Sequence, residues 1–269
     1  QQNILGAAAK AKTRILNILV LGIMAGSFIA MGAQSSSLAV HNISNIGLAR
    51  TLAGCIFPVG LMMIVFVGGE LFTGDCMMSM AWMQRKIHFA DMLRTLVLVY
   101  VSNFVGAALI AFLVAHSGQY DYSSGALGAY TIKVAYGKVH LSFANALVSG
   151  ILCNILVCVA VLMAAAAKDI AGKVLAIFFP ILAFVVSGFE HCVANMYYIP
   201  AGIFASKNAA YAAKALELYN IDSTQLSSLN WGSFAISNLI PVTIGNIIGG
   251  ALLVGGACFY LHGKALHES

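Results

Sequence analysis

The residues of this chain best suited to chemistry lie inside long apolar stretches, where ionisable side chains are costly. His191 and its neighbour Glu190 interrupt one such stretch, and Glu70 and Asp75 flank Thr73 in another. Ionisable residues in apolar spans are usually functional. A ring N–H of His191 can donate a hydrogen bond or a proton, and the Thr73 hydroxyl is a neutral donor. These groups predict a site for a small anion.

The neighbours of these residues suggest supporting roles. A bare carboxylate repels anions, so we expect Glu70 and Asp75 to accept backbone N–H bonds or to pair with a cation. Glu190 is expected to orient the His191 ring, either directly or through a water or backbone link. Asn195 would share a face with His191 if the segment is helical. Leu71 and Phe72 could form an apolar constriction that strips water from a passing ion.

Other kinds of chemistry find little support. One His, two Glu and one Asp at these depths have neither the spacing of a metal site nor a nucleophile beside its base, so we expect no enzyme, no catalytic residue, no metal and no cofactor. None of the six cysteines forms a Cys-x-x-Cys pair. The net charge of +5 comes from isolated Lys and Arg residues rather than from a basic run, which argues against nucleic-acid binding.

The composition identifies the surroundings as a lipid bilayer. Hydrophobic residues make up 61% of the 269 residues and charged residues only 9%, whereas soluble domains are about 25% charged. Six apolar blocks are long enough to span a membrane as helices. They are residues 15–33, 51–83, 95–115, 143–167, 174–204 and 234–260.

The second and fifth blocks are too long for one ordinary span, and glycines interrupt both. Interrupted helices survive in a membrane only where protein or a water-filled cavity surrounds them, and their half-helix N-termini favour anions. Sequence echoes link the halves: Ser102-Asn103 followed by Phe-Val-Gly-Ala-Ala-Leu resembles Gly245-Asn246 followed by Ile-Ile-Gly-Gly-Ala-Leu. We therefore expect an all-α protein of six transmembrane helices, arranged as an inverted 3+3 repeat with interrupted second and fifth helices. A single domain would cover residues 1–269, with halves at about 10–115 and 140–262.

The loops indicate an orientation. With the N-terminus in the cytoplasm, nine of the 14 Lys and Arg residues fall on the cytoplasmic side, in line with the positive-inside rule. Both termini would then be cytoplasmic, in a multi-pass protein of the inner membrane. The stretch 208–219 in an outer loop could form a short surface helix.

Three motifs together carry a family resemblance. They are Gly69-Glu-Leu-Phe-Thr-Gly74, Val186-Ser-Gly-Phe-Glu-His-Cys-Val-Ala-Asn-Met196 and Asn238-Leu-Ile-Pro-Val-Thr-Ile-Gly-Asn-Ile-Ile-Gly-Gly250. With them, the chain resembles the formate/nitrite transporter family over essentially its whole length. The sulfur-rich and acidic stretch after Thr73, Gly-Asp-Cys-Met-Met, points to the hydrosulfide branch.

The resemblance implies a homopentamer of aquaporin-like six-helix protomers, each with its own pore for small monovalent anions such as formate, nitrite or hydrosulfide. It places His191 at the anion site and Thr73 at the second-helix break. It also implies pore-facing asparagines at Asn154 and Asn246, an anion-attracting outer lysine at Lys138 and an N-terminal lysine at Lys10. The implied constrictions are Leu61 with Phe57 on the cytoplasmic side, and Leu71, Phe72 and Phe184 on the outer side.

An aquaporin-like channel for small neutral solutes is the main alternative. Such a channel would carry paired Asn-Pro-Ala boxes at the half-helix N-termini, and this sequence has none. The sequence leaves open which anion is carried and whether transport is passive or proton-linked.

Overall fold

Every regular element of the computed structural model is a helix over the residues that the structure describes, 2–262. The first half contains α1 (Gln2–Ala11), α2 (Ile15–Val40), α3 (Ile46–Ile56), α4 (Val59–Val67), α5 (Phe72–Asp75), η1 (Cys76–Met78), α6 (Ser79–Met83), α7 (Phe89–Ala115) and η2 (Gln119–Asp121). The second half contains α8 (Ala126–Val139), α9 (Phe143–Ala166), α10 (Ile170–Ser187), α11 (Cys192–Ser206), α12 (Ala209–Tyr219), α13 (Ser223–Ser227), α14 (Trp231–Ser233), the π-helices η3 (Phe234–Leu239) and η4 (Ile248–Val254), α15 (Ile240–Ile247) and α16 (Gly255–His262).

Six of these helical segments are long and apolar enough to cross a membrane, as the sequence predicted. They are Ile15–Val40, Ile46–Val67, Phe89–Ala115, Phe143–Ala166, Ile170–Ser187 and Trp231–Leu261. The first extends well beyond the predicted end at Ala33. Its polar continuation stays helical because the side chains of Gln34, Ser36 and Ser37 are buried against the bundle.

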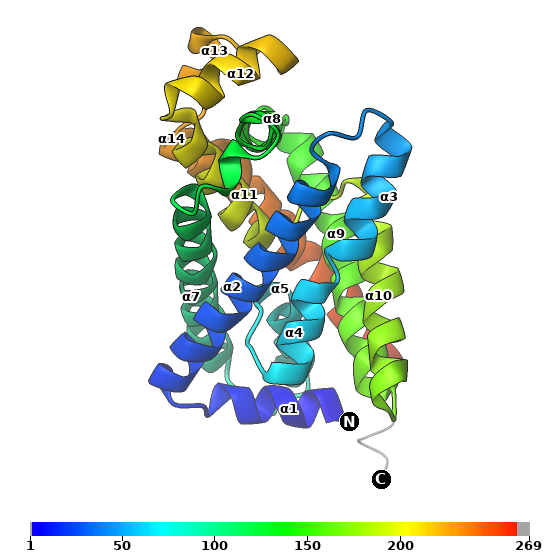
Figure 1. The fold of residues 1–269 in the computed structure, drawn as a ribbon. Helices are drawn as coiled ribbons and strands as arrows, with labels where there is room; N and C mark the ends of the chain where they lie inside the picture. Colours follow the sequence, from blue (N-terminus) through cyan, green and yellow to red (C-terminus); the bar gives the residue numbers. More distant parts are fainter. Residues whose placement is uncertain (1, 263–269) are drawn as a thin grey trace.

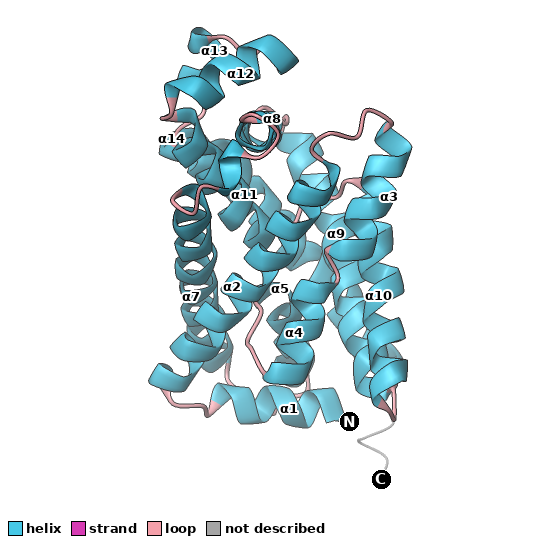
Figure 2. Cartoon of the chain, in the orientation of Figure 1, coloured by secondary structure: helices cyan, strands magenta, loops and turns pink. Residues whose placement is uncertain are grey.

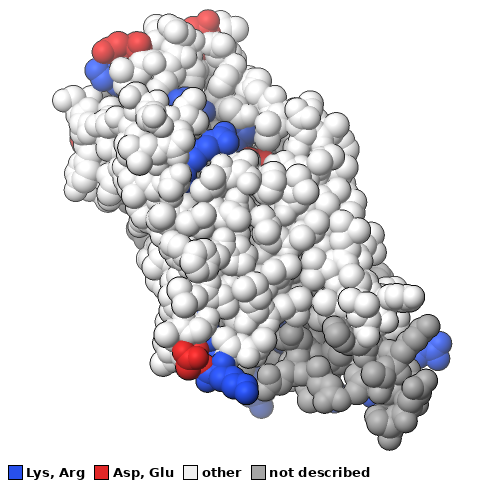
Figure 3. Space-filling view, turned by 90° about the vertical axis from the view of Figure 1, so that its right-hand side faces the viewer, with Lys and Arg blue, Asp and Glu red and all other residues white. Residues whose placement is uncertain are grey.

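The outer surface of the bundle is apolar between its two ends. Along α7, exposed apolar side chains recur every four residues at Leu93, Val97, Val101, Val105 and Leu109. This spacing places them on one helix face, which suits contact with lipid. Figure 3 shows the charged side chains gathered toward the two ends of the molecule, with a broad uncharged band between them.

The two ends carry different elements. In Figure 1 the helix α1 lies across one end of the bundle, hereafter the α1 face, whereas α8, α12 and α13 cover the other, hereafter the α8 face. Helix α16 ends near the α1 face, since both α1 and α16 contact α6. The surface helix predicted at 208–219 is confirmed as α12, where the Asn208 side chain accepts a hydrogen bond from the backbone N–H of Ala210.

Both predicted interruptions are present. Each overlong block is a full-length span followed by a short loop and a second, separate helix: α3–α4 leads into α5 through residues 68–71, and α10 leads into α11 through residues 188–191. The loop after α4 turns back into the body of the bundle (Figure 2). Both loops begin at a glycine with positive φ, Gly68 at 105° and Gly188 at 70°. Such values favour glycine, which has no Cβ to clash.

The two halves repeat each other in opposite orientation. Helix α2 starts at the α1 face and α9 starts at the α8 face (Figure 1). In the first half α2 packs along α7, and in the second half α9 packs along α15 and η4. Glycines allow the close approach in both pairs: a Cβ on Gly26 would lie 2.0 Å from the Asn103 carbonyl oxygen, and one on Gly245 would lie 2.2 Å from that of Leu147.

Adding a methyl group at Gly26 should therefore destabilise the fold. In Gly26→Ala the new Cβ would meet backbone rather than a movable side chain, and overpacking of this kind costs about 1–3 kcal/mol. We expect a lower thermal unfolding temperature in detergent, followed by tryptophan fluorescence. Gly137→Ala is the matched control, because a Cβ there meets nothing within 4 Å. If both variants unfolded at the same temperature, the close contact between α2 and α7 at Gly26 would not limit stability.

Candidate functional site

The first helix break is fastened by one asparagine of α7. The side-chain oxygen of Asn103 accepts a hydrogen bond of 2.9 Å from the backbone N–H of Phe72, the first residue of α5. The amide nitrogen of Asn103 donates to the carbonyl oxygens of Gly22 at 2.8 Å and Glu70 at 2.9 Å. Backbone groups exposed by a broken helix need partners at membrane depth. This side chain is the partner of two such groups and ties them to Gly22 in α2.

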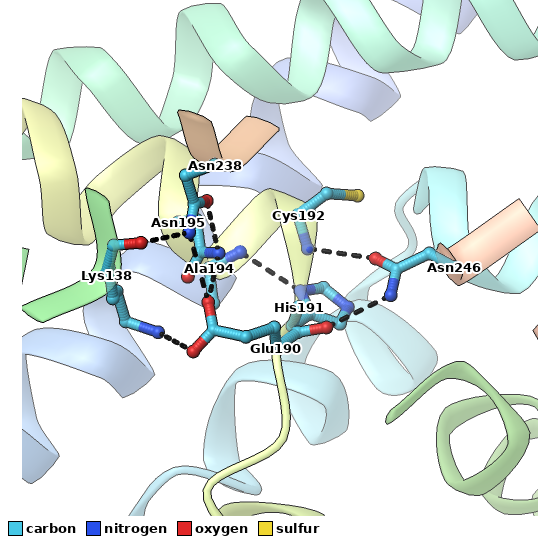
Figure 4. A network of polar contacts seen from close by, with 8 residues as sticks. All are labelled: Lys138, Glu190, His191, Cys192, Ala194, Asn195, Asn238 and Asn246. Carbon is cyan, nitrogen blue, oxygen red and sulfur yellow. Dashed lines mark hydrogen bonds and ion pairs between the residues drawn. The ribbon is translucent and has the colours of Figure 1, made fainter. Parts of the chain in front are cut away.

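The second break is fastened in the same way by Asn246 of α15. Its oxygen accepts a bond of 2.9 Å from the N–H of Cys192, the first residue of α11 (Figure 4). Its amide nitrogen donates to the carbonyl oxygens of Gly150 at 2.8 Å and Glu190 at 3.0 Å. The sequence echo between Ser102-Asn103 and Gly245-Asn246 therefore corresponds to a repeated structural device.

Asn154 belongs to this scaffold as well. Its amide nitrogen donates to the carbonyl oxygens of Thr73 at 3.1 Å and Asn246 at 2.6 Å. Asn154 and Asn246 are completely buried, and neither lines the cavities described below. The family resemblance predicts that both face the pore, and this stays a prediction; in the structure their amide nitrogens donate to backbone carbonyl oxygens at and beside the two breaks.

His191 and Thr73 come together from the two halves of the chain. Nε2 of His191 lies 2.9 Å from Oγ1 of Thr73, and both side chains are buried. His191 is also the N-cap of α11, because its Nδ1 accepts a hydrogen bond of 3.0 Å from the N–H of Ala194. An accepting Nδ1 carries no proton, so the neutral ring holds its proton on Nε2. The ring thus presents an N–H donor at the meeting point of the two breaks.

Glu190 points away from the ring of His191. Its carboxylate contacts Lys138 Nζ at 2.8 Å and accepts bonds from Asn195 at 2.6 Å and Asn238 at 3.4 Å (Figure 4). Of the links expected between Glu190 and the imidazole, the direct bond is not formed; the backbone N–H of Ala194 holds the ring instead. Neighbouring positions at a helix start project in different directions, which separates the two side chains.

Asn195 and Asn238 complete this polar cluster. The Asn195 amide nitrogen bonds Glu190 and the side-chain oxygen of Asn238, at 2.7 Å, rather than the imidazole. Asn238 also donates to the carbonyl oxygen of Lys138 at 2.9 Å. Sequence reasoning gave Asn238 no role, although a lone amide in an apolar span was a usable signal. It lies in the π-helix η3, and π-turns often occur at functional sites.

The cations of the α8 face differ in how far they are balanced. The charge of Lys138 is offset by Glu190, and its ammonium also lies 5.2 Å from the centre of the Tyr198 ring. Arg50 is exposed, and its guanidinium approaches only the carbonyl oxygen of Val186, at 3.5 Å, with no carboxylate partner in residues 2–262. Arg50 therefore carries more unbalanced positive charge into this mouth than Lys138 does.

Two cavities reach into the bundle from opposite faces. One of about 260 Å³ opens on the α8 face and is lined by His191, Arg50, Lys138 and the rings of Phe57 and Phe184. The other, of about 440 Å³, opens on the α1 face, and its lining residues include Lys10, Leu61, Glu70, Leu71 and Asp75. The imidazole forms part of the inner end of the first cavity, and the loop that carries Glu70 and Leu71 bounds the second.

The apolar residues divide differently from the expected grouping. Phe57 packs edge-on against Phe184, with ring centres 5.4 Å apart, and Phe184 stacks on His191 at 6.0 Å. Phe57 thus belongs with the α8-face cavity rather than with Leu61, because four residues of helix separate the two by about 6 Å along the axis. Leu71 was expected on the outer side with Phe184, but it lines the α1-face cavity together with Leu61. Phe72 lines neither cavity, and its ring packs on that of Tyr100, with ring centres 4.8 Å apart.

Lys10 reaches from α1 to the first break. Its ammonium pairs with the carboxylates of Glu70 and Asp75, the latter at 2.6 Å. Burial acts to lower the pKa of Lys10, but the two carboxylates outweigh it and raise the pKa above its usual value. Lys10 is therefore a permanent cation that ties α1 to the break.

The described residues contain no group of three or more His, Cys, Asp or Glu side chains that could hold a metal ion. The polar groups of the site are hydrogen-bond donors, amides and charged pairs. Such a set can hold and pass a small polar solute without a cofactor.

Comparison with known proteins supplies the context for this geometry. The family model described as "Formate/nitrite transporter" matches residues 2–260. The formate channel BtFdhC of Bacillus thuringiensis is 38% identical over 92% of this chain and 87% of its own. The formate channel FocA of Haemophilus influenzae is 36% identical over 93% of this chain and 88% of its own.

A solved structure agrees with the sequence comparisons. A pentameric formate channel with formate bound is similar with a TM-score of 0.81 and 31% identity, over 92% of this chain and 97% of that one. The family model spans both interruptions and nearly all of the six spans, so the resemblance inferred from the motifs is confirmed at the level of the family. This multi-pass membrane protein belongs to the formate/nitrite transporter family.

Proposed function

We propose that the chain forms a channel or transporter for small monovalent anions, with formate as the leading substrate. The observation that carries the proposal is the contact between His191 Nε2 and Thr73 Oγ1. His191 lines the α8-face cavity, whose lining combines the rings of Phe57 and Phe184 with cationic side chains. Because Nδ1 caps α11, the Nε2–H group is held in place as a donor. The formate channels among the relatives support formate as the first anion to test.

Attraction, dehydration and hydrogen bonding of the anion are assigned to different residues of the site. Arg50 and the other cations of the α8 face attract the anion by long-range electrostatics. The rings of Phe57 and Phe184 then remove water, which costs an anion several kcal/mol unless new donors replace it. The Nε2–H of His191 donates one hydrogen bond. The Thr73 hydroxyl can accept from Nε2 and turn its own proton to the anion.

The charge carried across the apolar residues decides between two modes of transport. If the anion takes up a proton from the water of the cavity, a neutral acid crosses, and the electrostatic penalty of a low-dielectric passage nearly vanishes. If it does not, the full charge must be stabilised by donors alone. Flux against pH distinguishes the two modes.

The assembly and its orientation are part of the proposal. Each protomer is one channel domain, five protomers form the particle, and the α1 face with both termini lies in the cytoplasm of an inner-membrane protein. The pentameric structure of a similar formate channel supports the assembly. The excess of Lys and Arg residues in the loops assigned to the cytoplasm supports the orientation.

A channel for small neutral solutes receives less support. The half-helices α5 and α11 begin at Phe72 and Cys192, and the residues before them, Leu71 and His191, do not belong to Asn-Pro-Ala boxes. An ionisable donor with a fixed proton is suited to an anion. A comparison of anion flux with glycerol flux decides between an anion channel and a channel for neutral solutes.

The test is a side-by-side flux experiment with purified oligomers in liposomes. Formate, nitrite, hydrosulfide and glycerol are compared at several pH values, with protein-free liposomes as the control. We expect rapid formate flux, slower or comparable flux of the other two anions, and glycerol flux at background. Hydrosulfide faster than formate would support the hydrosulfide branch suggested by the sulfur-rich stretch. Glycerol flux without anion flux would overturn the proposal.

The apolar residues should set selectivity. In Phe184→Ala or Leu61→Ala the dehydrating wall widens, so larger anions such as acetate or lactate should pass relatively faster than formate. Phe179→Ala, on the same helix as Phe184 but 60% exposed, is the matched control. The measurement is the ratio of flux rates for each anion pair. Ratios unchanged in both cavity variants would place the filter elsewhere.

A further inference from the structure

The two helix breaks share one plan of charged and amide side chains, with one difference. At the second break Glu190 is followed five residues later by Asn195, and Lys138 pairs with the carboxylate. At the first break Glu70 is followed five residues later by Asp75, and Lys10 pairs with both carboxylates. The second cluster therefore sums to zero charge, whereas the first carries one negative charge too many.

The geometry at Asp75 shows where the imbalance lies. The residue is only 3% exposed, and its Oδ1 lies 2.6 Å from Lys10 Nζ. Its second oxygen, Oδ2, is buried and has no hydrogen-bond partner among the described residues. A buried carboxylate oxygen without a donor is costly. At the corresponding position of the other break, the Asn195 amide donates to Glu190.

The surroundings offer no second cation in residues 2–262. The titratable groups that face the carboxylates of Glu70 and Asp75 are Lys10 from α1 and the thiols of Cys76 on η1 and Cys158 on α9. Arg94 on α7 directs its guanidinium to the carbonyl oxygen of Ala11, at 2.7 Å. The remaining side chains around the cavity are apolar; they include Leu61, Ile64, Met77, Met78 and Val161.

We propose that Glu70 and Asp75 bind one proton between them and form a protonation site in the α1-face cavity. Two buried carboxylates that pair with the same ammonium cannot both ionise without a large free-energy penalty, so one proton is shared between them. The bound proton gives an O–H donor to the group that otherwise has none. It also brings the cluster to zero charge, the sum found at the second break.

A consequence for transport follows, and it rests on the proposed function. When the pair is protonated, the α1-face cavity is neutral and admits an anion. When the proton leaves, the cavity gains a negative charge beside Leu61, and the local anion concentration falls, by about tenfold for a focused unit charge. Flux starting from the α1 face would then decrease as the pH on that face rises.

Infrared difference spectroscopy of the purified oligomer tests the proton itself, without any substrate. We expect a protonated-carboxyl C=O band that titrates with pH in the unaltered protein. It should disappear in Asp75→Asn and also in Glu70→Gln, because either change removes the second carboxylate. Glu217→Gln is the control, since Glu217 forms an exposed ion pair with Lys214 on α12. No titrating band, or one that persists in both variants, would overturn the proposal.

Sided flux measurements test the consequence. Formate flux is measured in right-side-out and inverted membrane vesicles while the pH is changed on one side only. Asp75→Asn should transport from the α1 face about tenfold faster than the unaltered protein at high pH, with little dependence on the pH of that face. An unchanged pH dependence would overturn the gating consequence. If the unaltered protein carries no anion, the proposed function fails, and the infrared titration still decides whether the pair binds a proton.

Discussion

Replacing His191 by asparagine is expected to lower anion flux by about 10- to 100-fold while leaving the protein folded. The loss corresponds to one hydrogen bond to a charged group, about 1.5–3 kcal/mol. Asparagine is among the best N-cap residues, so its side-chain oxygen can accept the Ala194 N–H bond that Nδ1 accepts here. What it cannot supply is the ionisable Nε2–H beside Thr73.

The pH profile separates a transport role from a packing role. Flux is measured against pH on oligomers of verified size, with His116→Asn, an exposed histidine at the end of α7, as the control. We expect the profile of His191→Asn to change shape, and its preference between charged and neutral substrates to change with it. If the variant merely assembled poorly, while its folded fraction kept the original pH profile, the role of His191 in transport would be wrong.

Much of this fold could be predicted because membrane spans follow from composition. Six apolar blocks, two of them interrupted by glycines, led directly to six spans and two breaks. The repeat was visible as the echo between Ser102-Asn103 and Gly245-Asn246, and in the structure the two asparagines bond equivalent backbone groups. Constraints that act on backbone geometry leave short local patterns, and these can be recognised in a sequence.

The partners of individual side chains were harder to predict. Glu190 lies next to His191 in the chain but pairs with Lys138, which lies 52 residues earlier. The family resemblance implied pore positions for Asn154 and Asn246, but it did not predict that their amides bond the backbone of the breaks. Each outcome depends on how helices from different parts of the chain are rotated against one another, and no local pattern records that rotation.

Removing the charge of Lys138 should cost far more stability than removing the whole ion pair. In Lys138→Met the Glu190 carboxylate, only 7% exposed, loses its cation, and breaking a buried pair typically costs about 3–5 kcal/mol. In the double variant Lys138→Met with Glu190→Gln no charge is left unpaired, and the Gln amide can still bond Asn195. We therefore expect thermal stability to fall sharply in the single variant and to recover largely in the double one. Equal losses in both would mean that the lysine contributes by packing over Tyr198 rather than by charge.

The same pair of variants, with Arg50→Gln beside them, tests which cation attracts anions to the α8 face. A balanced ion pair contributes little to the field at a distance, so its removal in the double variant should leave the salt dependence of anion flux unchanged. Arg50 has no carboxylate partner in the described part of the chain, so Arg50→Gln should slow flux mainly at low ionic strength, where the unscreened attraction reaches farther than about 10 Å. If instead the double variant lost the salt dependence and Arg50→Gln kept it, Lys138 would be the attracting residue despite its bond to Glu190. The resemblance to the family assigns attraction to Lys138; the charges around it assign attraction to Arg50, and leave Lys138 the task of holding Glu190 and the start of α11 in place.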